Sequence, residues 1–572
     1  MEILKGIGAS SGIALGPVYI YEKPEIYIGT EVIAPGETER ETEKYLGAVE
    51  KSKQQISIIA KATEQNMGVE SAKIFHAHLD IAEDPAIEES VLDKIRTEHK
   101  NAMQALWETK EEFCALLQDA EDEYFRDRAF DVADVCERIL CNLAGVVPAT
   151  LQHLPDAVIV VAEDLTPSVT ATMDREKVLA FVTEIGGKTA HSAIMARTLE
   201  IPAIVGLGGA REKLASGGMI IADGNTGQIR LNPDPDTIAA YEKQKEVLLQ
   251  EKAVLRELLD KDPVTQDGKR VELCANIGSP KDVEAVLANN GEGIGLFRTE
   301  FLYMDSSRFP TEEEQFDAYK RVVQDMAGRP VIIRTLDIGG DKTLPYFTFP
   351  SELNPFLGYR AIRMCLDMPE IFKTQLRALL RASAYGKLLI MLPMIISLEE
   401  FRAAKVILEE CKGELSAQDI TFDEEIAIGI MVETPAAVLM ADEFAKEVDF
   451  FSIGTNDLTQ YTLAVDRGNE TISSLFSSYH PAVLRAIKMV IDAAHREGKF
   501  VGMCGEFAGD EQAVPLLLGM GLDEFSVSAS SLLRVKKIIR NWDYTRAVDL
   551  AEAALRLKTA AEVETFLGQQ TD

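Results

Sequence analysis

The chain has 572 residues, and 46% of them are hydrophobic, a share typical of globular proteins with large buried cores. Acidic residues outnumber basic residues by 93 to 59, and the resulting net charge of −34 disfavours binding to nucleic acid or to an anionic membrane. No apolar run is long enough to span a membrane. We therefore expect a soluble cytoplasmic protein of about two to four domains, with no nucleic-acid or membrane partner.

The first part of the chain predicts a small α/β domain interrupted by helices. Residues 1–21 form short strand-like segments broken by glycine, and strand-like runs return at 156–164, 177–187 and 218–234. Between them, residues 34–145 repeat apolar side chains at spacings of three and four, which predicts four long helices. We expect an α/β domain of residues 1–33 and 146–233 with this helical domain inserted.

The second part predicts a barrel. A charged helical stretch at residues 234–261 suits a linker. Beyond it, eight short apolar runs alternate with stretches of helical composition: VELCAN, GIGLF, VIIRTLD, LLIMLPM, IAIGIMV, FFSIGT, FVGMCG and EFSVS. Eight strands alternating with helices over about 300 residues predict a (β/α)8, or TIM, barrel for residues 262–572. An open doubly wound sheet is the alternative.

Polar and charged side chains stand where these runs end, which is where barrel enzymes build their active sites. They are Asn276, Arg298, Arg334, Asp337, Glu433, Asn456, Asp457 and Cys504. The arginines, with Arg467, suit a small phosphate ester, because a guanidinium binds phosphate and carboxylate oxygens through two parallel hydrogen bonds. Glu433 and Asp457 supply hard oxygen ligands of the kind that Mg²⁺ prefers. Each residue alone fits a surface salt bridge, but the set indicates phosphoryl transfer.

The seven cysteines are scattered, with no CxxC pair and no Cys/His metal spacing, and we expect reduced thiols that mostly serve packing. Cys504 is the exception, because it lies between glycines in GMCGEFAGDE, where a thiol can exchange a proton with a substrate. A small side chain that fills the barrel mouth is the alternative for this position. Asn456 can donate a neutral hydrogen bond nearby.

One histidine stands in an unusual context, EIGGKTAHSAIMART at residues 184–198. A strand-like run and a glycine turn precede it and a helical pattern follows, so free backbone N–H groups and the helix dipole favour an anion there. With the hydroxyls of Thr189 and Ser192 beside it, we interpret His191 as a nucleophile that carries a phosphoryl group. Without the barrel residues, a capping or packing role is the commoner interpretation. GGKT is not a P-loop, because Val182 replaces the required glycine.

Together these segments resemble enzyme I of the bacterial sugar phosphotransferase system, the phosphoenolpyruvate–protein phosphotransferase family. GGKTAHSAIMAR is similar to the family's phosphohistidine signature and DFFSIGTNDLTQYTLAVDR to its second signature. GLFRTEFLY, RTLDIGGDK, NPFLGYRAIR and MVETPAA follow the expected order, and the resemblance covers essentially the whole chain. Lys188 and Ala190 depart from the commoner pattern without removing a reacting group.

The resemblance implies roles for particular residues. His191 is phosphorylated on its imidazole, Glu433 and Asp457 hold Mg²⁺, and Cys504 protonates the enolate to give pyruvate. Phosphoenolpyruvate is bound by Arg298, Arg334, Asn456, Asp457 and Arg467. The phosphoryl group then passes to a histidine of the phosphocarrier protein HPr, which docks on the helical domain, and the barrel domain forms a homodimer.

Three further expectations concern motion, docking and alternatives. The α/β domain has to swing between its two partners, with the linker and residues 144–156 as candidate hinges, and residues 68–80 and 119–131 are candidate docking stretches for the carrier. A nucleotide-using relative, such as pyruvate phosphate dikinase or phosphoenolpyruvate synthase, is the nearest alternative, but it carries a large nucleotide-binding domain. A catalytically silent regulatory scaffold is the alternative from a different class.

Overall fold

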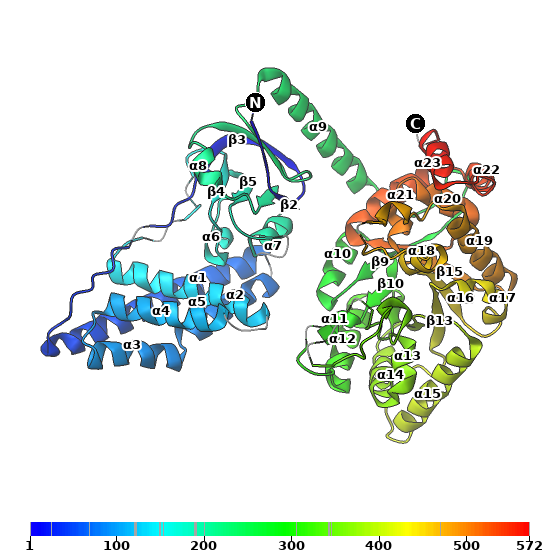
Figure 1. Ribbon diagram of the computed structural model, residues 1–572, viewed down its shortest axis with the longest axis horizontal. Helices are drawn as coiled ribbons and strands as arrows, with labels where there is room; N and C mark the ends of the chain where they lie inside the picture. Colours follow the sequence, from blue (N-terminus) through cyan, green and yellow to red (C-terminus); the bar gives the residue numbers. More distant parts are fainter. Residues whose placement is uncertain are drawn as a thin grey trace. The chain divides into compact units, whose positions relative to one another are not determined.

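The structure is a computed structural model in two compact units, Met1–Gln250 and Glu251–Asp572 (Figure 1). It describes residues 2–570 except 25, 68, 119–122, 148, 149, 153, 188–190, 200, 305, 341, 343, 345 and 470. Within these residues, no helix combines the length and apolar character that a membrane span needs. All seven cysteines are free thiols, as expected from their scattered positions.

The first unit contains an eight-stranded mixed sheet with the order β1-β8-β7-β3-β4-β5-β6-β2. Its strands are β1 (Glu2–Lys5), β2 (Ile7–Ser10), β3 (Ile13–Ile20), β4 (Val158–Ala162), β5 (Val178–Thr183), β6 (Ala203–Val205), β7 (Met219–Asp223) and β8 (Gln228–Leu231). The central strands from β3 to β6 run parallel, and antiparallel strands flank them. Strand β6 was not predicted, because three apolar residues between Pro202 and Gly206 are too few to show a period.

The described residues between β3 and β4 include five α-helices, which pack around their own apolar core. They are α1 (Thr38–Met67), α2 (Val69–Ala82), α3 (Pro85–Thr97), α4 (Ala102–Gln118) and α5 (Glu123–Ala144). The inserted helical domain is therefore present, but the prediction of four helices was wrong. The last predicted helix is in fact two helices, α4 and α5. The prediction missed this division because the residues between them, DAED, include no glycine or proline that would indicate a break.

The second unit contains a closed barrel of eight parallel strands. They are β9 (Glu272–Ile277), β10 (Gly293–Arg298), β11 (Val331–Arg334), β12 (Leu388–Leu392), β13 (Ala427–Val432), β14 (Phe450–Ile453), β15 (Phe500–Met503) and β16 (Glu524–Ser528). The pairing of β16 with β9 closes the barrel and excludes the open sheet. The strands are almost continuously apolar because side chains fill the interior and helices cover the outside.

Helices between successive barrel strands show the amphipathic pattern that this packing requires. In α19 (Pro481–Arg496), for example, Val483, Ile487, Val490 and Ile491 are buried at helical spacing. The helix α9 (Pro235–Glu257) occupies most of the predicted linker, and the division between the two units falls inside it. The limits assigned to the other domains stay predictions.

Candidate active site

The predicted residues of the second unit stand where the barrel strands end. Arg298 is the last residue of β10 and Arg334 the last of β11, and the two are paired across the sheet. Glu433 directly follows β13, Cys504 directly follows β15, and Asp457 lies in the first turn of α18 (Thr455–Leu463). Because parallel strands end at one rim of a barrel, side chains far apart in the chain meet there.

A buried ion-pair network occupies this rim. Arg334 donates through Nη2 to Glu300 Oε1 at 2.5 Å and pairs through Nη1 with Asp337 Oδ2 at 3.0 Å. Arg360 donates through Nη2 to the other oxygen of Asp337 at 2.8 Å, and Lys342 Nζ lies 2.8 Å from Glu300 Oε1 and 3.1 Å from Asp337 Oδ2. Burial on this scale is tolerated only because every charge has an opposite neighbour.

Sequence analysis missed three members of this network, Glu300, Lys342 and Arg360. Each lies in a loop or helix beyond a strand end, so the strand-end rule did not single it out. The available signal was their position inside FRTEF, RTLDIGGDK and NPFLGYRAIR, segments already noted for other reasons. Arg360, only 2% exposed, is the largest fully buried side chain among the described residues, which marks it as a member of the site.

Two carboxylates at the rim have oxygens without a hydrogen-bond partner. Glu433 Oε1 accepts from the backbone N–H of Met394 at 2.5 Å, whereas its Oε2 has no partner among the described residues. The same holds for Oδ1 of Asp457, whose nearest cation is Arg360 Nη1 at 3.8 Å. Burial, followed by the neighbouring Asp457 and Asp337, raises the pKa of Glu433 to about 8. Two adjacent carboxylates with unused oxygens fit a divalent cation with oxygen ligands.

The charges at this rim balance without such a cation only when Glu433 is ionised. The cationic side chains are Arg298, Arg334, Lys342 and Arg360, and the carboxylates are Glu300, Asp337, Glu433 and Asp457. A divalent cation bound to Glu433 and Asp457 would give the rim a net positive charge. A strongly anionic phosphate ester then finds an attractive site on a protein whose net charge is −34.

Cys504 is buried beneath these charges, at 2% exposure. Burial raises the pKa of its thiol to about 11, against the lowering effect of Ser452, Arg334 and Arg298. The Ser452 hydroxyl donates to Sγ at 3.3 Å, and the backbone carbonyl of Cys504 accepts from the Asn276 amide at 3.0 Å. The thiol is therefore protonated at neutral pH and can donate a proton, while Asn276 holds the strand ends in register.

The remaining predicted binding residues are Arg298, Asn456 and Arg467. Arg298 lines a cavity of about 800 Å³ together with Asn276 and Gly505. The Asn456 side chain accepts from the backbone N–H of Glu506 at 3.4 Å. Arg467 is exposed beyond α18, and its backbone N–H donates to Gln460 at 3.0 Å. The place of the Arg467 guanidinium beside a substrate stays a prediction.

His191 lies in the first unit, as the first residue of α7 (His191–Thr198). The helix follows β5 in the chain and packs against β2 and β6, with Ala193 and Ala196 fully buried. The backbone thus has the predicted strand and helix start, and residues 188–190 of the predicted turn lie outside the described residues. The His191 side chain and all of Thr189 lie outside the described residues, so the anion site there stays a prediction.

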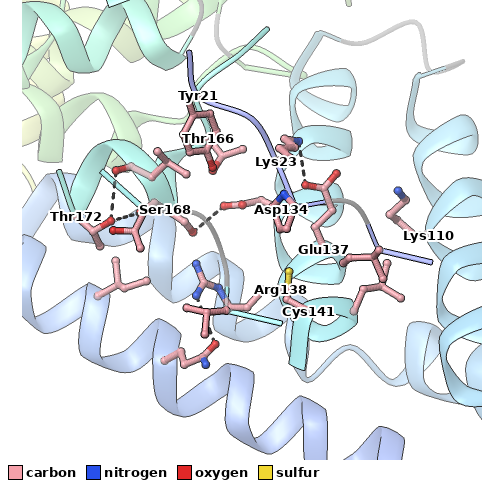
Figure 2. A pocket seen from close by; sticks show the side chains of 18 of the residues that line it. Tyr21, Lys23, Lys110, Asp134, Glu137, Arg138, Cys141, Thr166, Ser168 and Thr172 are labelled. Atoms are coloured by element: carbon pink, nitrogen blue, oxygen red, sulfur yellow. Dashed lines mark hydrogen bonds and ion pairs between the residues drawn. The ribbon is translucent and has the colours of Figure 1, made fainter. Parts of the chain in front are cut away.

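The first unit also has a cavity of about 450 Å³ between the helical domain and the sheet domain (Figure 2). In Figure 2 the Ser168 hydroxyl donates to Asp134 at 2.7 Å, and Lys23 pairs with Glu137 at 2.9 Å. Tyr21 and Arg138 also line this cavity, which includes none of the predicted catalytic or substrate-binding residues.

Comparisons with known proteins agree with this arrangement. Family models match the N-terminal part of PEP-utilising enzymes at residues 5–128, their mobile domain at residues 154–227 and their PEP-binding domain at residues 252–544. Relatives named phosphoenolpyruvate-protein phosphotransferase are 48% identical over 568 residues in Staphylococcus carnosus (strain TM300), 50% over 569 in Listeria monocytogenes serovar 1/2a and 49% over 567 in Bacillus subtilis (strain 168). Each alignment covers 99% of both chains.

Fold and site together define a PEP-utilising phosphotransferase, with a mobile α/β domain and a barrel. At the barrel rim, buried guanidinium groups lie beside two carboxylates with unpartnered oxygens, and the identities extend over all the matched domains. The chain belongs to the phosphoenolpyruvate–protein phosphotransferase family, enzyme I. The resemblance seen in the sequence and the predicted fold class are thereby confirmed.

Proposed function

We propose that the protein transfers the phosphoryl group of phosphoenolpyruvate to its own His191, releases pyruvate, and passes the phosphoryl group to a histidine of HPr. This is the first step of the sugar phosphotransferase system, and we place it in the cytoplasm. The observation that carries the proposal is the barrel rim, where buried guanidinium groups lie beside two carboxylates with unpartnered oxygens. The shared name of the full-length relatives indicates the donor and the kind of acceptor.

The cationic side chains at the barrel rim bind the substrate. Arg298 and Arg334, at adjacent strand ends, bind the phosphate and carboxylate oxygens of phosphoenolpyruvate, with Arg360 beside them. The ion pairs of Arg334 with Glu300 and Asp337, and of Arg360 with Asp337, hold these two guanidinium groups in place before the substrate arrives. Asn456 and Arg467 add a neutral and a charged hydrogen bond from the segment after β14.

Glu433 and Asp457 would hold Mg²⁺ through their unpartnered oxygens. When bound, such an ion would supply positive charge that neutralises the phosphate oxygens. The role of the two carboxylates is to place that positive charge at the rim. Asp337 lies in the same network, and its pKa is held well below its usual range by Arg334 and Arg360 against the effect of burial, so it stays an acceptor for their N–H groups.

Loss of the phosphoryl group leaves the enolate of pyruvate, which needs a proton on carbon. The Cys504 thiol is the candidate donor, because its raised pKa keeps the proton on sulfur at neutral pH. The resulting thiolate is then reprotonated from solvent before the next turnover. The Ser452 hydroxyl supports this step by donating a hydrogen bond to the sulfur.

On the other unit, the imidazole of His191 attacks phosphorus and later gives the phosphoryl group to the carrier. Its place at a helix start favours the added negative charge. The inserted helices α1 to α5 are the proposed docking region for HPr, and the barrel domain is the proposed homodimer contact. The candidate docking stretches, residues 68–80 and 119–131, and the candidate hinge, residues 144–156, lie partly outside the described residues.

The proposal is tested with labelled phosphoenolpyruvate and Mg²⁺, without nucleotide. We expect an acid-labile phosphoenzyme in the unaltered protein and none in His191→Ala, while His76→Ala, which changes an exposed histidine of α2, serves as the matched control and retains the label. Mass spectrometry should place the phosphate on residue 191, and adding HPr should remove it. A labelled His191→Ala protein, or a requirement for ATP, would refute the assignment.

A further inference from the structure

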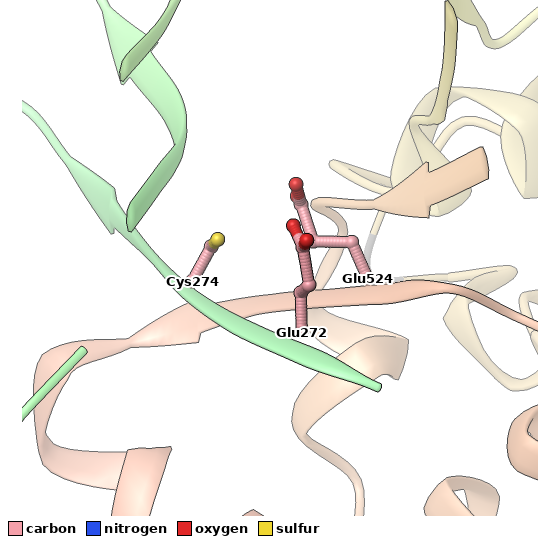
Figure 3. A group of neighbouring side chains, drawn as sticks. All are labelled: Glu272, Cys274 and Glu524. Atoms are coloured by element: carbon pink, nitrogen blue, oxygen red, sulfur yellow. The ribbon is translucent and has the colours of Figure 1, made fainter. Parts of the chain in front are cut away.

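The barrel holds a second cluster of ionisable side chains at the end opposite the candidate active site, where its strands begin. Figure 3 shows Glu272 and Cys274 on β9 and Glu524 on β16, with the three side chains on the same side of the strands. Glu272 and Cys274 share a face because they are two residues apart. Glu524 is the direct cross-strand partner of Glu272. The Cys274 sulfur and one oxygen of each carboxylate all lie within 4.8 Å of one another.

Glu524 has an unsatisfied oxygen at this cluster. Its side chain is only 2% exposed, and Oε1 has no hydrogen-bond partner within the described part of the chain. A buried carboxyl oxygen without a partner is unfavourable, so a ligand bound to Oε1 would be stabilising, although the Cys274 thiol already interacts with this carboxyl group. The backbone is also adapted to it, because a Cβ added at Gly295 would come within 2.2 Å of Oε1.

The cluster consists of acidic groups, and within the described residues it includes no cationic side chain. Burial, together with Glu272, raises the pKa of Glu524 to about 8, and burial with the nearby carboxylates raises the pKa of Cys274. Arg270 at the barrel edge is engaged with Glu292, and Lys387 and Lys499 line the cavity at this end. A positive ion among these three groups would oppose both the burial and the repulsion that raise the two pKa values.

The cluster has a route to solvent. A cavity of about 640 Å³ opens at this end of the barrel, and both Glu272 and Glu524 line it. Lys387, His495 and Asp523 lie on its other walls. Since Glu272 is itself exposed, an ion can enter through this cavity and reach Cys274 and Glu524 behind it.

We propose that Glu272, Cys274 and Glu524 bind a divalent transition-metal ion of the zinc type, at a site separate from the Mg²⁺ site of the active end. A thiolate with two carboxylates favours Zn²⁺ over Mg²⁺, because sulfur is a soft ligand. On binding, the Cys274 S–H bond breaks, a sulfur–metal bond forms, and the proton leaves to water through the cavity, as does any proton on Glu524. Three protein ligands leave room for a water molecule from the same cavity.

A metal ion at this site would cross-link the two strands whose pairing closes the barrel. β9 and β16 are the first and last barrel strands, and their pairing closes the sheet. An ion held by both strands binds the closed barrel and not the unfolded chain, so it favours the closed form. The proposal does not depend on phosphoryl transfer at His191, and the two can fail separately.

The test uses the full chain, stripped of metal with a chelator and then titrated with Co²⁺ or Zn²⁺ alone. We expect one equivalent of Co²⁺ to give the charge-transfer absorption of a cobalt–thiolate bond, and Zn²⁺ to displace it. The band should vanish in Cys274→Ser and weaken in Glu524→Gln, and it should persist in Cys504→Ser, the matched change at the other end of the barrel. Zn²⁺ should raise the unfolding temperature by about 5 °C at a hundredfold excess over Kd.

No band in the unaltered protein, or a band that survives Cys274→Ser, would overturn the proposal. A cluster that binds only protons also gives no band and counts against it. Circular dichroism checks that each variant is folded. If Cys274→Ser does not fold, Glu272→Gln decides the matter, because loss of this exposed ligand must weaken Co²⁺ binding at least about tenfold, and an unchanged affinity would overturn the proposal equally.

Discussion

Arg360 Nη2 donates to Asp337 Oδ1 at 2.8 Å, and both side chains are almost fully buried. The second oxygen of Asp337 meets Arg334 Nη1 at 3.0 Å and Lys342 Nζ at 3.1 Å. One carboxylate therefore holds three cations at the rim of the barrel, and the position of each cation depends on it.

Removing this carboxylate should destabilise the barrel strongly. Asp337→Ala removes the carboxylate that the buried Arg334 and Arg360 guanidinium groups share, and we expect the free energy of unfolding to fall by about 3–5 kcal/mol. Urea unfolding of the second unit measures the change. The control is Arg308→Ala, which removes an exposed partner of Glu314 and should change stability far less. Equal losses in the two variants would contradict the buried network.

The buried arginines should matter for substrate as well as for stability. A lost charge-assisted contact is worth about 1.5–3 kcal/mol, so Arg334→Ala and Arg360→Ala should each reduce kcat/KM for phosphoenolpyruvate by about 10- to 100-fold. Arg363→Ala is a control from the same segment as Arg360, because Arg363 donates to the loop carbonyls of Leu357 and Gly358. Unchanged kinetics in Arg334→Ala would reject its role.

Cys504→Ser should separate the two halves of the reaction. Serine is a much weaker acid than a thiol, so we expect pyruvate to form slowly while substrate binding and phosphorylation of His191 are less affected. Rapid-quench measurements of labelled phosphoenzyme and of pyruvate in a single turnover provide the comparison. Cys365→Ser, a change at another buried thiol of the barrel unit, is the control. Equal slowing of both products would argue for a packing role of Cys504.

Binding of Mg²⁺ should depend on pH through Glu433. Its pKa of about 8, against a usual 4.5, means that the folded protein keeps a proton that competes with the cation. Apparent affinity for Mg²⁺ should therefore rise with pH and level off above about 8, with proton release in calorimetry. Glu433→Gln should abolish most of the binding. A pH-independent affinity in the unaltered protein would contradict this assignment.

The same raised pKa predicts the stability of the metal-free protein. Below about 4.5 the folded and unfolded states are both protonated at Glu433, whereas between about 4.5 and 8 only the folded state keeps the proton. Stability should thus fall as pH rises through this window. Glu433→Gln should remove only part of this decrease in stability, because Glu524, with a pKa also near 8, contributes a decrease of the same sign. Thermal unfolding of the unaltered protein and of Glu433→Gln, measured as a function of pH, tests this prediction.

Much of the fold could be predicted because its signals are local. Each barrel strand is an apolar run such as LLIML or FFSI, and the structure has a strand at each of the eight predicted runs. The strand-end rule also found Arg298, Arg334, Glu433 and Cys504. It could not find Arg360, because the segment NPFLGYRAIR has no strand end of its own and reaches the rim only through folding.

The sequence by itself determined the alternation of strands and helices, the inserted helical domain and the family, since periodicity and motifs depend on neighbours in the chain. Only the tertiary structure decided which charges meet. Cys274 shows no metal spacing in the sequence, yet closure of the barrel brings it within reach of Glu524, 250 residues away. Pairing across a closed sheet joins residues irrespective of their separation in the chain, and no local pattern records that contact.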